Sequence, residues 1–141
     1  MDSKDYAILE ELEKDSRQST ALIARKTGIP RVTVHERMEK LRKSGGIKNF
    51  STVLDYKLLG KPVNAFILVT FNSKSVTQHE LAEKISKMPG VSEVCIIAGE
   101  WDLLVKVHSE SLEKLGELIV DKLRKIDGVE KTVTMPVLSS R

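Results

Sequence analysis

An internal repeat in the second half of the chain restricts the possible folds more than any other feature. Residues 87–91, KMPGV, recur as residues 125–129, KIDGV, at an offset of 38 residues. The same offset aligns Phe66–Val69 with Leu104–Val107, two short apolar segments that we predict to be strands. Each copy of the repeat therefore begins with a strand.

The rest of each copy predicts a helix and then a second strand. The helices are expected at residues 78–88 and 112–126, and the closing strands at residues 92–98 and 130–137. Two successive β-α-β units predict an α+β, ferredoxin-like β-α-β-β-α-β domain. Right-handed crossovers would place both helices on one face of the sheet. The strands are too rich in Val, Ile, Leu and Phe for the other face to remain in water, so we predict a homodimer through stacked sheets.

The first half of the chain predicts a helix-turn-helix. Ser19 can cap a short helix, Gly28 can end it, and Pro30 can open the next helix with its fixed φ. The second helix carries one apolar stripe at helical spacing, made of Val34, Met38 and Leu41. This short turn is typical of proteins that place their second helix in the major groove of DNA.

Positive charge is concentrated around that second helix. Between Arg25 and Lys48 there are eight Lys and Arg against two Glu, a net charge of +6. Residues 1–60 carry +3 and residues 61–141 carry zero. A cationic patch attracts the phosphate backbone of DNA, although a charge run can also be only a solvated helix face.

The change in charge and the break at Gly60-Lys61-Pro62 predict two small domains. Residues 1–48 would form the helix-turn-helix domain, with its first helix at residues 5–15. Residues 49–62 would form an extended linker, with a short turn from Tyr56 to Gly60. Residues 63–141 would form the sheet domain.

Cellular location and cofactors are constrained by what the sequence lacks. The single Cys95 lies in an apolar run, which predicts a buried thiol in a reducing compartment. We find no stretch as long as a membrane span and no signal peptide, and we expect a soluble protein of the cytoplasm, associated with the nucleoid. No motif indicates a metal site or a cofactor.

The segment Gly99-Glu100-Trp101-Asp102 between two predicted strands allows two interpretations. It can be a β-hairpin turn with a structural tryptophan. It can also form part of a small-molecule site, with Asp102 accepting from an ammonium group, because such sites favour concave seams between subunits.

The order and spacing of several short motifs in this chain resemble those of the Lrp/AsnC family of prokaryotic transcriptional regulators. They are Asp5-x-x-Ile8-Leu9-x-x-Leu12, Gly28-Ile29-x-x-x-x-Val34-x-x-Arg37-Met38, Gly99-x-Trp101-Asp102 and Gly128-Val129-x-x-Thr132-x-Thr134. The resemblance implies a helix-turn-helix domain joined to a ligand-binding domain of β-α-β-β-α-β fold. It also implies dimers that assemble into tetramers, octamers or larger oligomers, with an amino acid or related effector bound between these domains.

The candidate site residues form two groups. Helical geometry and the charge pattern select the DNA-binding group, which is Arg25, Arg31, Val32, Thr33, His35, Glu36, Lys40 and Lys43. Val32 stands where the family usually has a small hydroxyl residue, and it can pack against a thymine methyl group. We expect Arg37 to pair with a carboxylate of the first helix rather than with a base. The resemblance selects the effector group, which is Ala98, Gly99, Trp101, Asp102, Thr132, Thr134 and Met135.

Two other functions remain as alternatives. Some proteins with this architecture decarboxylate tetrapyrroles with the help of histidines, but His35, His79 and His108 are scattered here and no catalytic set is present. We therefore expect no enzyme. A DNA-organising architectural protein without an effector is the second alternative.

Overall fold

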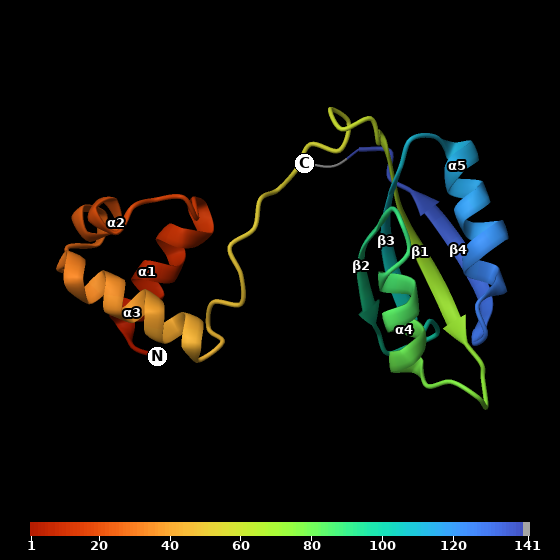
Figure 1. Ribbon diagram of the computed structural model, residues 1–141, viewed down its shortest axis with the longest axis horizontal. Coiled ribbons are helices and arrows are strands. Elements are labelled where there is room, and N and C mark those ends of the chain that lie inside the picture. Colours follow the sequence, from red (N-terminus) through yellow and green to blue (C-terminus); the bar gives the residue numbers. More distant parts are fainter. Residues whose placement is uncertain (140–141) are drawn as a thin grey trace. The chain divides into compact units, whose positions relative to one another are not determined.

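The computed structural model describes residues 1–139, and its helices and strands are labelled in Figure 1. These residues contain two hydrophobic cores that share no residue. One core belongs to the unit up to Val53 and the other to the unit that begins at Leu54. Each unit therefore has the hydrophobic core of its own that an independent domain requires. Within residues 1–139, no helix is long and apolar enough to cross a membrane.

The first unit is a bundle of three helices whose ends are fixed by local side chains. Asp2 caps the first helix and forms a capping box with Asp5, while the Ser19 side chain accepts from the backbone N–H of Leu22 at the second. Gly28 ends the second helix at φ 70°, a left-handed conformation that glycine adopts without strain. The helices are α1 (Ser3–Lys14), α2 (Thr20–Thr27) and α3 (Arg31–Lys43).

The start of α3 differs by one residue from the sequence prediction. Pro30 has an extended ψ of 138° and occupies the N-cap position, so Arg31 rather than Pro30 is the first helical residue. The apolar stripe lies inward as predicted. Val34 and Leu41 are buried, and Met38 packs partly buried against the same core.

The second unit is a four-stranded antiparallel sheet made of β1 (Val63–Phe71), β2 (Val91–Ile96), β3 (Leu103–Ser109) and β4 (Val129–Pro136). The strand order is β2-β3-β1-β4. In the register, Ile67 of β1 lies opposite Val105 of β3 on one side and Thr134 of β4 on the other. This is the predicted ferredoxin-like arrangement.

One face of the sheet is covered by helices, as predicted from crossover handedness. The two helices are α4 (Gln78–Ser86) and α5 (Leu112–Glu117). Alternate residues of β1, namely Ala65, Ile67 and Val69, form one buried cluster with Leu81 of α4 and Leu115 of α5. Where we predicted a single helix over residues 112–126, α5 continues as a π-helical turn (Leu118–Lys122) and then a 3-10 turn (Leu123–Lys125).

The opposite face, which we call the open face, carries apolar side chains that no element of the described chain covers. Its members alternate with the core residues along the strands. Five of them are Phe66, Leu68, Leu104, Val133 and Met135, and Val133 and Met135 are 43% and 40% exposed.

Cys95 also lies on the open face, opposite Leu104, and the prediction of a buried thiol is wrong. The side chain is only half-buried because the apolar run around it alternates between the two faces. Partial desolvation and the neighbouring Glu93 carboxylate nevertheless raise the pKa of the Cys95 thiol.

Candidate nucleic-acid interface and effector region

The first two turns of α3 present a row of side chains away from the helical core. Because Val34 and Leu41 are directed inward, the residues on the other side of the helix remain accessible. Val32 is 69% exposed, so its apolar surface is available to a partner. The five residues that we predicted to read bases lie here: Arg31, Val32, His35 and Glu36 are exposed, and Thr33 is half-buried.

The residues predicted to contact phosphate are also accessible. Lys40 and Lys43 are exposed in the last turn of α3, and Arg25 is exposed in the last turn of α2. Within residues 1–139, none of these three cations has a carboxylate at ion-pairing distance, and neither does Arg31. Their charge is therefore available to an external anion.

Arg37 has a different role, and the prediction of an ion pair with the first helix is confirmed. Its Nη1 atom lies 2.8 Å from Asp5 Oδ1 in α1 and 2.6 Å from Asp2 Oδ1 at the cap of α1. The hydrogen bond from Arg37 is the main reason that the pKa of Asp2 falls to about 2. Arg37 thus ties α3 to α1 through its Nη1 atom.

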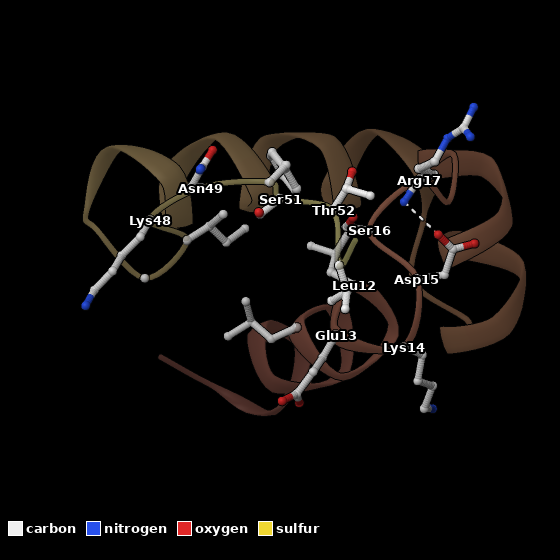
Figure 2. Close-up of a pocket in the computed structure, with 15 residues that line it drawn as sticks. Leu12, Glu13, Lys14, Asp15, Ser16, Arg17, Lys48, Asn49, Ser51 and Thr52 are labelled. Atoms are coloured by element: carbon white, nitrogen blue, oxygen red, sulfur yellow. Dashed lines mark hydrogen bonds between the residues drawn. The ribbon is translucent and has the colours of Figure 1, made fainter. Parts of the chain in front are cut away.

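A groove that the sequence analysis missed lies between the end of α1 and the segment after α3 (Figure 2). It has a volume of about 680 Å³, and Leu9, Leu12 and Ile47 supply apolar lining while Lys14, Asp15, Arg17 and Lys48 supply polar lining. Past Ile47 the chain stays exposed, with Phe50 at 46% and Val53 at 101%. No sequence pattern marks this groove because it arises from the path of an irregular segment.

The Gly99-Trp101-Asp102 segment forms the turn between β2 and β3, at the end of the sheet where β1 ends. Gly99 has φ 135°, which side chains rarely adopt, and both Ala98 and Gly99 are exposed. Trp101 is half-buried. The backbone N–H of Asp102 donates to Val69 of β1 at 3.0 Å, so the turn is fastened to the central strand.

The Asp102 carboxylate is engaged inside the protein. Its Oδ2 accepts from the backbone N–H of Phe71 at 2.7 Å, and its Oδ1 accepts from the side-chain amide of Gln78 at 3.3 Å. Phe71 sits at a register shift between β1 and β4, where the regular ladder is interrupted. Asp102 therefore supplies the acceptor that the irregular strand needs, and only its remaining lone pairs are available to a ligand.

The three candidate effector residues on β4 do not lie on one face. Thr132 and Thr134 lie opposite Val69 and Ile67 and share their helix-covered side, where Arg124 Nε donates to Thr132 Oγ1 at 3.0 Å. Met135 lies opposite Phe66 and belongs to the open face. In addition, β4 and β2 are opposite edges of the sheet, so a single chain does not gather all seven candidate residues into one pocket.

The three histidines occupy unrelated positions. His35 is exposed on α3, His79 is exposed on α4, and His108 is buried in β3, where its Nδ1 is hydrogen-bonded to Asn64 Oδ1. Burial lowers the pKa of His108, and the charges of Lys106 and Lys61 lower it further. Among the described residues, no group of three or more His, Cys, Asp or Glu side chains is arranged to hold a metal ion.

Comparisons with known proteins agree with this architecture. Residues 1–42 match the model of the AsnC-type helix-turn-helix domain, and residues 64–141 match that of the Lrp/AsnC ligand-binding domain. An uncharacterised HTH-type transcriptional regulator of Pyrococcus furiosus is 46% identical over 136 residues, which is 96% of this chain and 91% of the relative.

Solved structures share the complete fold. LrpC of Bacillus subtilis superposes with a TM-score of 0.87 at 30% identity, covering 100% of this chain and 96% of LrpC. A transcriptional regulator from Neisseria meningitidis, solved as a complex with L-methionine, superposes with a TM-score of 0.90 at 21% identity, covering 99% of this chain and 90% of the regulator.

Proposed function

Because this chain belongs to the Lrp/AsnC family of transcriptional regulators, we propose that it binds operator DNA through α3 and that an amino acid sets its affinity. The relatives are named as regulators and not as enzymes. The proposal extends to the effector, the oligomer and the role of individual residues. We retain the domain boundaries expected from the sequence, residues 1–48, 49–62 and 63–141.

The DNA-binding part of the proposal is supported mainly by which cations of α3 are ion-paired within the protein and which are not. Arg37 is committed to Asp2 and Asp5, whereas Lys40 and Lys43 have no carboxylate partner within residues 1–139. We assign base contacts to Arg31, Val32, Thr33, His35 and Glu36, and phosphate contacts to Arg25, Lys40 and Lys43. Contacts with base edges would give sequence preference, and contacts with phosphates would give affinity that falls with salt.

The open face supports the proposed homodimer. Its apolar side chains, Phe66, Leu68, Leu104, Val133 and Met135, would be removed from water by the same face of a second copy. A two-fold symmetric dimer would also present two α3 helices to a symmetric operator. Larger assemblies, tetramers or octamers, would form by further contacts between sheet domains.

For the effector, the proposal is a site completed by more than one chain. Within one chain, Met135 lies on the opposite face of the sheet from Thr132 and Thr134, so a site containing all three needs a neighbouring copy. The methionine complex of the Neisseria meningitidis regulator supports an amino acid as the ligand class. Differential binding to two assembly states would couple the ligand to DNA affinity.

A thermal-unfolding screen against the twenty amino acids tests the effector proposal. A ligand that binds only the folded state raises the midpoint by mass action, by about 2.7 kcal/mol of stability at a hundredfold excess over Kd. A shift with one or two amino acids that is lost in Asp102→Asn supports the proposal. No shift with any of them would leave a DNA-organising protein, which would show a steep salt dependence with little sequence preference.

A further inference from the structure

An aromatic contact joins the segment before the sheet to the sheet itself. The ring of Tyr56 stacks on the ring of His108 in β3, with centroids 3.5 Å apart and an interplanar angle of 6°. His108 is only 7% exposed, and its Nδ1 is bonded to Asn64 Oδ1 at the start of β1. Since the amide oxygen is an acceptor, Nδ1 carries the proton and the ring is held in one orientation.

Burial and two nearby cations disfavour the charged form of the His108 ring. Lys106 on β3 and Lys61 before β1 both lower the pKa of His108, in addition to burial. Tyr56 and Asn64 are the uncharged groups against the ring. The two rings lie nearly parallel and almost directly over each other, so the contact covers one face of each ring and places Tyr56 against the sheet.

Backbone hydrogen bonds within its own turn also hold Tyr56 in place. The backbone N–H of Lys61 donates to the carbonyl of Tyr56 at 2.8 Å, and that of Gly60 donates to Lys57 at 3.1 Å. Gly60 closes this turn at φ 74°. The turn leads directly into β1, so residues 56–62 belong mechanically to the sheet unit.

On the other side, the last buried residue of the helical unit is Ile47, which we take as its anchor. It is 8% exposed and its N–H donates to the carbonyl of Leu41 at 3.1 Å. Residues 48–55 are all exposed. The tether between the two anchors, Ile47 and Tyr56, can therefore span at most about 30 Å.

We propose that the Tyr56–His108 stack is a positioning contact that limits the length of this tether and thereby the spacing of DNA half-sites that a dimer can bind. This rests on the proposed function as a dimeric DNA-binding regulator. Without the stack, only backbone hydrogen bonds within the turn hold residues 56–62, and when these open the reach from Ile47 to Val63 rises to at most about 55 Å. A longer tether lets the two helix-turn-helix domains of the dimer reach half-sites at other separations. It also lowers the effective concentration of the second domain at its half-site once the first domain is bound.

The test is a half-site spacing series with the full-length protein. Two copies of a half-site, obtained by selection with the wild-type protein, are moved apart or together in steps of one base pair. A displacement of three base pairs shifts a half-site by roughly 10 Å and rotates it by about 100°. We expect the wild type to lose about tenfold or more in affinity at that displacement, and Tyr56→Ala to lose about threefold or less.

Matched variants separate tether length from general damage. Tyr56→Phe keeps the ring and should keep the wild-type profile, and so should Leu58→Ala, whose side chain is 85% exposed in the same turn. His108→Ala should broaden the profile as Tyr56→Ala does, and the double variant should broaden it no further. Identical profiles for the wild type and Tyr56→Ala would overturn the proposal.

A second readout does not involve DNA. Hydrogen exchange of the Lys61 and Gly60 amides should speed up in Tyr56→Ala and stay slow in Leu58→Ala. Unchanged exchange in Tyr56→Ala would show that the stack does not hold the turn, and would overturn the proposal even if DNA binding is normal. Failure of the wild type to prefer paired half-sites over a single one, with the exchange result as expected, would instead locate the failure in the proposed dimeric DNA binding.

Discussion

Replacing Asp102 should reveal whether its first task is to complete the sheet. In the wild type its carboxylate accepts from the backbone N–H of Phe71 at 2.7 Å, at the position where β1 and β4 shift register. Asp102→Ala removes this acceptor and leaves a half-buried N–H without its partner. Hydrogen bonds to charged groups contribute about 1.5–3 kcal/mol, so we expect a loss of about 2 kcal/mol.

The loss converts into a measurable change in melting temperature. For a domain of this size, 1 kcal/mol corresponds to about 4–8 °C, which predicts a decrease of roughly 8–16 °C in Asp102→Ala. Asp102→Asn keeps an oxygen that can accept from Phe71 and should lose less than about 1 kcal/mol. The fluorescence of Trp101, the only tryptophan of the chain, reports unfolding of the sheet unit directly.

A melting temperature of Asp102→Ala within about 2 °C of the wild type would refute this reasoning, because the hydrogen bond would then contribute little. The expected result also decides which variant tests effector binding. Asp102→Asn removes the charge that an ammonium group would need while preserving the fold, so a lost ligand response in that variant can be read as lost binding.

Three further predictions concern the two cores and the open face. Ile23 is 0% exposed, so Ile23→Ala should lower the free energy of unfolding of the helical unit by about 2–5 kcal/mol in calorimetry and leave the unfolding transition reported by Trp101 unchanged. A shift of both transitions would contradict the independence of the two cores. The pKa values of Asp2 and Glu11 are lowered to about 2, so the unfolded state binds more protons than the folded state between about pH 4.5 and 2, and helicity should be lost as the pH falls through that range. Asp2→Asn lacks the contact between Asp2 and Arg37 and should lose helicity at a higher pH, whereas an unchanged acid transition would count against that contact. Leu68→Lys places a charge on the open face and should convert the dimer into a monomer in sedimentation velocity, and a dimer of unchanged affinity would show that another surface mediates association.

The elements that follow local chemistry were predictable from the sequence. Ser19 and Gly28 fix the ends of α2 through a cap and a left-handed turn, and both depend on neighbouring residues only. The 38-residue repeat predicted both β-α-β units because each copy carries its own apolar pattern. The exposed face of α3 was predictable from helical spacing once Val34 was assigned to the core.

Arg37 was correctly paired with the first helix, but other contacts between distant segments were not predictable. The role of Asp102 depends on an irregularity at Phe71, 31 residues away. The Tyr56–His108 stack joins an irregular turn to a strand, and no periodicity marks it. Cys95 was assigned to the core because a continuous apolar run does not reveal which of its side chains lies on the open face.

The most direct test of the account is selection of DNA from a random pool by the wild-type protein, Val32→Ser and Lys43→Gln. We predict that the wild type enriches a symmetric sequence and that Val32→Ser changes the preferred base at one position in each half-site. Lys43→Gln should keep the wild-type sequence and reduce the slope of log affinity against log salt by about 1.8, because the dimer loses one phosphate contact in each half-site. No enriched sequence, or the same sequence for the wild type and Val32→Ser with equal affinity, would contradict the assignment of α3 as the helix that reads bases.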